Sequence, residues 1–447
     1  MKSTFLSLTK MNSDLTVKVA VENTTYVFDK LFDYLVPSAF TDLVQVGKRV
    51  LVPFGRGNKK KQGIIFELSP VSDDIPVEKL KSICSVLDDE PVLSKELLKL
   101  AEFMKEHYFC TYYDAVKTML PAGINYKITT LYGVREGVDE EELSEEQQRI
   151  FAYLHSKRKA VKSDKILDDF GLDNTVILED MVKSGYLYKS DEAFRKVSDA
   201  VMKMAAPTEL ADSDNIKLTE KQKAVLDLIK MTGGTSVKEV CYFTGVTTGV
   251  TDALYKKGLI YYYDEEVFRI EDRTKDESLA PVALSKQQQT ACDNLYAEYA
   301  DSKPHTSLLF GVTGSGKTSV FMKLIERVMN DNKGIIVMVS EISLTPQFVS
   351  TFSKRFGEQI AVFHSALSLG ERLDEYKRVK KGLAKIVIGT RSAVFAPFEK
   401  VGLIIMDEEQ EYSYKSESSP RYHAREIAKF RCSYDNALLV LSSATPS

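Results

Sequence analysis

Residues 311–318 read GVTGSGKT, and this string matches the G-x-x-x-x-G-K-[ST] pattern of a phosphate-binding loop. An apolar run over 307–310 precedes it, and an amphipathic stretch over 319–329 follows it. A strand can therefore deliver the chain to a tight glycine turn, and the N-terminus of the next helix can face a polyphosphate. The pattern predicts a nucleoside triphosphate site in an α/β domain. The candidate nucleotide-binding residues are Gly311, Val312, Thr313, Gly314, Ser315, Gly316, Lys317 and Thr318.

An acidic motif further along the chain adds a catalytic hypothesis. The apolar run over 401–406 leads directly into DEEQ, which begins with Asp407 and Glu408. An aspartate at the end of a buried strand can hold Mg²⁺ beside Thr318, and the next carboxylate can orient the attacking water. We therefore predict Lys317, Asp407 and Glu408 as catalytic residues, Thr318 and Asp407 as metal ligands, and ATP and Mg²⁺ as cofactors. A strand that ends in solvated acids is the alternative, and the upstream loop argues against it.

Further apolar runs in the C-terminal third predict more buried strands. They cover 335–339, 385–388 and 438–441, and each is followed by a polar segment. In an open parallel sheet the loops at the carboxyl ends of the strands face the ligand crevice. These polar segments are therefore candidates for contact with a ligand.

Five segments of the C-terminal third follow one another in a specific order: SEISLTPQ (340–347), HSALSLGER (364–372), GTRSAVFAPF (389–398), DEEQ (407–410) and SATPS (443–447). With these motifs, residues 284–447 resemble the first motor lobe of superfamily 2 helicases, and within them the PriA family of primosomal replication-restart helicases. Two positions depart from the family pattern, because Gln410 stands where a histidine is usual and Ser340 where a proline is usual.

The resemblance implies further site residues. Gln288 matches the glutamine that reads adenine in this family, although polar surface at a helix start is the alternative. The family carries an aromatic-rich loop after DEEQ that couples DNA to ATP hydrolysis. Rings can stack on unpaired bases there while cations follow phosphates, and a solvated turn with ordinary tyrosines is the alternative. The matching DNA-binding candidates are Arg391, Tyr412, Tyr414, Lys415, Arg421 and Tyr422.

The N-terminal part resembles another domain of the same family. Short strand-like runs come first and a helical run follows, and the strings FDYLVP, GKRVLVPFG and LKSICSVLDDEPVL are similar to the domain that captures the 3′ end of a nascent strand. The matching positions imply a pocket with a ring for the terminal base, a carboxylate for the 3′-hydroxyl and a cation for phosphate. These DNA-binding candidates are Phe32, Asp33, Gly55 and Lys81, and ordinary core and turn residues are the alternative.

An internal repeat separates these two parts. LSEEQ at 143–147 recurs as LTEKQ at 218–222, and each copy continues through helical segments to a strand-like tail. The pattern is typical of a winged helix, which the family also carries. Direct DNA contact and a bracing role both remain open. We expect a multidomain α/β chain with a disordered lead (1–16), an N-terminal β-rich DNA-binding domain (17–125), winged-helix-like modules (140–200 and 215–272) and a RecA-like parallel-sheet P-loop motor lobe (280–447).

Composition limits the other possibilities. The net charge of −4 excludes a basic field over the whole chain, so contact with DNA must depend on local patches. The five cysteines are scattered without a C-x-x-C pair. We therefore expect no zinc site and a cytoplasmic protein. No apolar run approaches the roughly 20 residues of a membrane span.

The resemblance implies an ATP-dependent 3′-to-5′ DNA helicase that acts at stalled or repaired replication forks in replication restart. Its implied partners are forked or single-stranded DNA, other primosome proteins and single-strand-binding protein, with no membrane. The family's second motor lobe, which carries an arginine finger worth about 10³ to 10⁵ in rate, is not in the sequence, so weak hydrolysis is expected. The alternative is a non-enzymatic scaffold that binds fork DNA.

Overall fold

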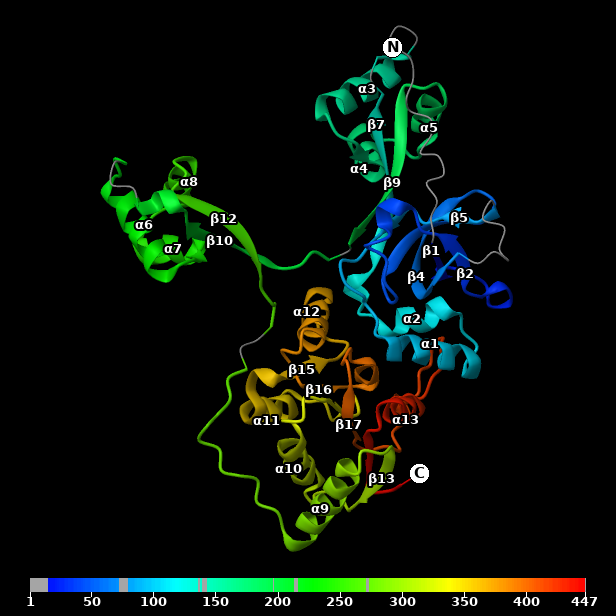
Figure 1. Cartoon of the computed structure of the whole chain (residues 1–447), viewed down its shortest axis with the longest axis vertical. Coiled ribbons are helices and arrows are strands. Elements are labelled where there is room, and N and C mark those ends of the chain that lie inside the picture. Colours follow the sequence, from blue (N-terminus) through cyan, green and yellow to red (C-terminus); the bar gives the residue numbers. More distant parts are fainter. Residues whose placement is uncertain are drawn as a thin grey trace. The chain divides into compact units, whose positions relative to one another are not determined.

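The computed structural model describes residues 15–71, 79–135, 137–138, 143–195, 197–212, 216–270 and 273–446 (Figure 1). The expected disordered lead falls outside this range except for residues 15 and 16, which begin strand β1. The chain divides into two compact units, of which the smaller covers 197–271 and the larger covers the remainder.

The N-terminal domain is a six-stranded sheet with two helices. Its strands lie in the order β5-β2-β1-β4-β3-β6, and the β1–β4 pair is antiparallel with a register shift between Lys18 and Val19. Alternating apolar residues such as Val17, Val19 and Val21 fill the core on one face. The elements are β1 (Leu15–Val21), β2 (Phe32–Leu35), β3 (Arg49–Phe54), β4 (Lys59–Pro70), β5 (Lys81–Ser82), β6 (Ser85–Val86), α1 (Lys95–His107) and α2 (Tyr112–Met119).

Two small modules follow with the same order of elements. The long helix of each begins with a capping box, formed by Ser144 and Gln147 in the first module and by Thr219 and Gln222 in the second. The first contains β7 (Tyr126–Val134), α3 (Glu145–Lys157), β8 (Val161–Lys162), α4 (Ser163–Phe170), α5 (Val176–Lys183) and β9 (Leu187–Arg195). The second contains β10 (Val201–Pro207), α6 (Glu220–Thr232), β11 (Thr235–Ser236), α7 (Val237–Thr244), α8 (Thr248–Lys256) and β12 (Ile260–Glu266).

The first strand of each module precedes the boundary that the sequence indicated. β7 pairs with β9 and β10 pairs with β12, so each opening strand is joined to the closing strand of its own module. Pairing between residues far apart in the chain leaves no local pattern, so the sequence indicates the helices and the closing strand of each module but not its opening strand. The assignment of these modules to the winged-helix class stays a prediction.

The C-terminal lobe is a six-stranded parallel sheet in the order β13-β18-β17-β14-β16-β15. Its central strands β14 and β17 are buried along their whole length, which explains their continuous apolar sequence. The strands are β13 (His305–Phe310), β14 (Gly334–Met338), β15 (Ile360–Phe363), β16 (Ile386–Gly389), β17 (Val401–Met406) and β18 (Leu438–Ser443). The helices are α9 (Lys286–Ala300), α10 (Lys317–Val328), α11 (Pro346–Phe356), α12 (Leu369–Lys380) and α13 (Ala424–Asp435).

Candidate active site

The glycine-rich loop lies between the end of β13 and the start of α10, as its sequence predicts. Gly314 and Gly316 have φ angles of 77° and 81°, a left-handed region that residues with a side chain rarely adopt. α10 begins at Lys317, whose Nζ donates hydrogen bonds to the Gly311 carbonyl at 2.6 Å and to the Val312 carbonyl at 3.2 Å. The helix N-terminus and this ammonium group can therefore meet an anion together.

Gln288 reaches this loop from the start of α9. Its Nε2 donates to the Ser315 carbonyl at 2.8 Å, and its Oε1 accepts from the Ser285 backbone N–H at 2.8 Å. A Cβ at Gly316 would lie 2.4 Å from the same Nε2, so the loop backbone approaches Gln288 closely. Of the three consecutive glutamines, this one contacts the phosphate-loop backbone, and adenine recognition by it stays a prediction.

Asp407 follows the last residue of β17 and is largely removed from water. Burial is the main cause that raises the pKa of its carboxyl, and the neighbouring Glu408 charge raises it further. The Ser442 hydroxyl donates to its Oδ1 at 2.7 Å and opposes the rise, as does the positive charge of Lys317. Lys317 therefore lies close enough to Asp407 for the charges of the glycine-rich loop and the acidic motif to interact.

Glu408 is held by two serines of the segment that follows β14, of which only Ser340 was discussed from the sequence. Its Oε2 accepts hydrogen bonds from the Ser340 hydroxyl at 3.3 Å and the Ser343 hydroxyl at 3.1 Å. Ser340 is the position where the family usually has proline, which has no side-chain donor. The departure from the pattern therefore supplies a contact to the carboxylate that we expect to orient water.

Gln410 joins the DEEQ motif to the last strand of the sheet. Its Oε1 accepts from the Ser443 hydroxyl at 2.6 Å, while Ser442 bonds Asp407. Glu409 donates its backbone N–H to the Ser442 carbonyl at 2.9 Å and pairs with Arg425 at 2.7 Å. The glutamine that stands in place of the usual histidine thus links the DEEQ motif to the SATPS motif.

The aromatic-rich loop presents one of its three predicted tyrosines to solvent. Tyr412 is 69% exposed, whereas Tyr414 is 0% exposed and donates its hydroxyl to the Asp407 carbonyl at 2.6 Å. Tyr422 is also buried and meets the Phe395 ring edge-on at 5.0 Å. The rings of Tyr414 and Tyr422 therefore offer no face to a base in this structure, and they support the loop instead.

The positively charged side chains of the same region also differ in exposure and in their contacts. Lys415 and Arg421 are exposed, and a contact of either with DNA stays a prediction. Arg391 donates to the Ser413 carbonyl at 3.2 Å and the Lys415 carbonyl at 2.5 Å. Arg391 thereby fixes the aromatic-rich loop against the turn that follows β16.

Three of the four N-terminal candidates lie near one another. The Phe32 ring meets Phe54 edge-on at 5.0 Å, and Lys81 donates its Nζ to the carbonyl of the next residue, Gly55, at 3.0 Å. Alternation along β2 directs the Asp33 side chain to the face opposite Phe32, where Lys18 is its register partner. The structure therefore brings a ring and an ammonium group together but not the carboxylate.

Thr318 and Asp407 suit a magnesium ion that is shared with a triphosphate. Among the described residues no group of three or more histidines, cysteines or acids is placed to hold a metal alone. Mg²⁺ bound to phosphates needs only one or two protein ligands, and a carboxylate after the end of β17 with a hydroxyl at the start of α10 can meet that need. Within the described part of the chain, no helix has the length and apolar character to cross a membrane.

Two family models match separate parts of the chain. A family model described as a 3′ DNA-binding domain matches residues 18–121, and one described as DEAD/DEAH box helicase matches residues 285–447. Among solved structures, RecG bound to a three-way DNA junction is 25% identical, with a TM-score of 0.28 over 37% of this chain and 22% of that chain.

Three relatives share the name replication restart protein PriA, and two of them match most of the chain. The replication restart protein PriA of Bacillus subtilis (strain 168) is 35% identical over 443 residues, which cover 96% of this chain and 53% of that protein. PriA of Synechocystis sp. is 31% identical over 428 residues, covering 93% and 50%. PriA of Treponema pallidum is 48% identical over 165 residues, covering 37% and 25%. The chain spans about half the length of the first two relatives.

Proposed function

The chain belongs to the PriA family of replication restart proteins, and we propose that it serves as the ATP-dependent motor and DNA-binding part of a 3′-to-5′ DNA helicase. In this proposal it acts at stalled or repaired replication forks in the cytoplasm. Its partners are forked or single-stranded DNA, other primosome proteins and single-strand-binding protein. The chain covers about half the length of the first two relatives, so the activity and the partners are proposals for this protein.

The observation that carries the proposal is the meeting of three motifs at Asp407. The charge of Lys317 in the glycine-rich loop acts on its carboxyl, and the hydroxyl of Ser442, next to the SATPS motif, donates to it at 2.7 Å. Such a convergence at the carboxyl edge of a parallel sheet supports a site for a nucleoside triphosphate. Lys317 would meet the phosphates, and Thr318 and Asp407 would hold Mg²⁺, which neutralises phosphate charge when bound. Glu408 would orient the attacking water.

Two other regions support the DNA part of the proposal. The cluster of Phe32, Gly55 and Lys81 offers a ring and a cation to a strand end, and exposed Tyr412 offers a stacking surface close to Asp407 in sequence. Tyr414 connects Tyr412 to the nucleotide site, because it lies in the same short helical turn as Tyr412 and donates its hydroxyl to the Asp407 carbonyl. DNA at this loop can therefore influence the acidic motif.

ATP hydrolysis under single-turnover conditions, with and without forked DNA, tests the proposal. We expect forked DNA to accelerate hydrolysis by the wild-type chain and Lys317→Ala to abolish it. Lys323→Ala on the same helix is the matched control, because Lys323 pairs with Glu326 and not with the loop. Fork binding without any ATP binding would contradict the motor and favour the scaffold. Equal hydrolysis by Lys317→Ala would overturn the assignment of the site.

A further inference from the structure

Two serine hydroxyls and the Glu408 carboxylate form a small hydrogen-bonded cluster. Ser343 donates its hydroxyl to Glu408 Oε2 at 3.1 Å, and the Ser340 hydroxyl lies 2.8 Å from the Ser343 oxygen and 3.3 Å from the same Oε2. A hydroxyl has one proton, so Ser340 donates it either to Ser343 or to Glu408. In both arrangements one oxygen of the carboxylate is tied to the pair of serines.

The turn that carries the serines is itself well ordered by hydrogen bonds. The Ser343 N–H donates to Ser340 Oγ at 3.2 Å, and the Ser343 and Leu344 N–H groups both donate to the Ser340 carbonyl at 3.1 Å. Ser340 is only 2% exposed, and the Thr345 hydroxyl that follows caps α11. The two hydroxyls are therefore set in place before a nucleotide arrives, which is what precise orientation of a catalytic group requires.

The backbone of Glu408 is fixed as well. Its φ angle is 50°, in the left-handed region that residues with a side chain rarely adopt, and such a conformation persists only where the surroundings hold it. The Glu408 N–H donates to Asp407 Oδ1 at 3.1 Å, and its carbonyl accepts from the Glu411 N–H at 2.9 Å. Among the described residues, the hydrogen bonds to its carboxylate reach Oε2. Oε1 is therefore the oxygen that can accept from water.

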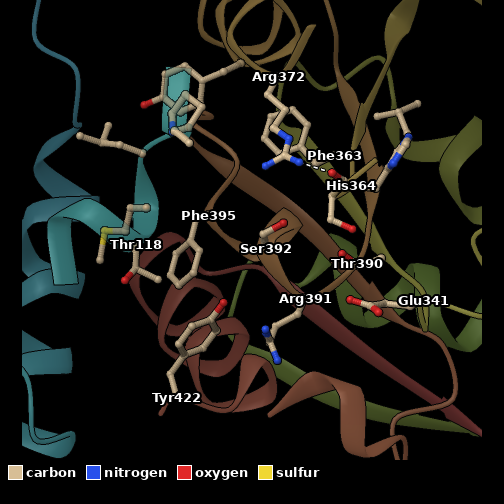
Figure 2. Close-up of a pocket in the computed structure, with 17 residues that line it drawn as sticks. Thr118, Glu341, Phe363, His364, Arg372, Thr390, Arg391, Ser392, Phe395 and Tyr422 are labelled. Atoms are coloured by element: carbon tan, nitrogen blue, oxygen red, sulfur yellow. Dashed lines mark hydrogen bonds between the residues drawn. The ribbon is translucent and has the colours of Figure 1, made fainter. Parts of the chain in front are cut away.

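Neighbouring side chains of the same turn point to different places. Ser340 is buried against Glu408, whereas the next residue, Glu341, is exposed and lines the pocket drawn in Figure 2, together with Thr390 and Arg391. Ser340 also stands where the family usually has proline, which has no hydroxyl to donate. The double contact to Glu408 thus depends on a residue at which this chain departs from the family pattern.

We propose that Ser340 and Ser343 are positioning residues for Glu408, which tie Oε2 of its carboxylate so that Oε1 faces the attacking water. The inference rests on the proposed function, which supplies the water and the triphosphate. It adds that the two serines act on the hydrolytic step through Glu408 and leave nucleotide binding unaffected. Either serine can donate to Glu408 alone, so removal of one should have a smaller effect than removal of both.

Single-turnover ATP hydrolysis with forked DNA measures the step, and titration with a non-hydrolysable ATP analogue measures binding. We expect the double variant Ser340→Ala, Ser343→Ala to hydrolyse ATP about tenfold or more slowly, with the analogue affinity of the wild type, because the carboxylate loses both donors. Ser343→Thr keeps the hydroxyl and should match the wild-type rate. Ser350→Ala, at an exposed position of α11, is the control and should also match the wild type.

A second background shows whether the serines act through the carboxylate. In Glu408→Gln the double serine change should slow hydrolysis no further, because the group that it orients is already altered. Wild-type hydrolysis by the double serine variant, or weaker binding of the analogue to it, would overturn the inference and leave the proposed function intact. Wild-type hydrolysis by Glu408→Gln would instead contradict the catalytic site that the proposed function assigns, and the role of the serines with it.

Discussion

Arg431 of α13 and Glu96 of α1 form a buried, two-pronged ion pair between the motor lobe and the N-terminal domain. The Nε–Oε1 and Nη2–Oε2 distances are 2.6 and 2.9 Å, and both side chains are almost completely buried. Arg431 also donates to the Val394 and Ala396 carbonyls, which flank Phe395. One guanidinium thus joins the N-terminal domain to the turn that carries Arg391.

Removal of Glu96 should destabilise the chain strongly. Glu96→Ala leaves the Arg431 charge buried without its partner, and a loss of about 3 to 5 kcal/mol in the free energy of unfolding is expected. Glu102→Ala on the same helix is the control, because its pair with Lys99 is partly exposed and contributes about 0 to 1 kcal/mol. Urea denaturation followed by circular dichroism measures both. Equal midpoints for the two variants would contradict the role of the pair.

Affinity for a Mg·ATP analogue should fall as the solution is acidified. Burial raises the pKa of Asp407 above that of an exposed aspartate, so its carboxylate takes up a proton at a higher pH, and Mg²⁺ requires the deprotonated form. The same raised pKa means that this group's contribution to folding stability is greatest in acid and is lost as pH rises through the folded-state pKa. Binding titrations at a series of falling pH values should show a steeper decline in the wild type than in Asp407→Asn. A wild-type decline no steeper than that of the variant would argue against the assignment.

Ser442→Ala should move this pH profile to higher pH. The hydroxyl donates to the Asp407 carboxylate and lowers its pKa, so its removal should raise that pKa further. Ser443→Ala is the neighbouring control, because Ser443 bonds Gln410 and not Asp407. The same titrations measure both variants. Superimposable profiles for Ser442→Ala and the wild type would rule out this contribution.

Tyr412 and Tyr414 should differ in their effect on DNA affinity although only Ser413 separates them. Tyr412→Ala removes an exposed ring, and a loss of about 1 to 3 kcal/mol in affinity for single-stranded DNA is expected. Tyr414→Phe removes only a buried hydroxyl that bonds the Asp407 carbonyl, so DNA affinity should be retained. Anisotropy titrations with oligo-dT measure both. A greater loss in Tyr414→Phe would contradict this division.

Local patterns were sufficient to predict five of the six strands of the motor lobe, the glycine turn and the acidic motif, because each depends on neighbouring residues, whereas β15 (Ile360–Phe363) was not predicted. Contacts made across the fold left no such trace. The donation of Ser442 to Asp407, the reach of Gln288 to the loop and the burial of Tyr414 all depend on how the sheet brings distant segments together. The opening strands β7 and β10 were missed for the same reason, since each pairs with a strand far along the chain.

The central claim is that Lys317 and Asp407 serve one magnesium-bound triphosphate, and calorimetric titration with a non-hydrolysable ATP analogue tests it most directly. Titrations with Mg²⁺ and with EDTA are compared for the wild type, Lys317→Ala and Asp407→Asn. We predict that Mg²⁺ tightens binding to the wild type, that Asp407→Asn loses most of this gain, and that Lys317→Ala weakens binding about tenfold or more in both solutions. The claim would be contradicted if Mg²⁺ increased the affinity of Asp407→Asn for the analogue as much as that of the wild type, or if Lys317→Ala bound the analogue with wild-type affinity.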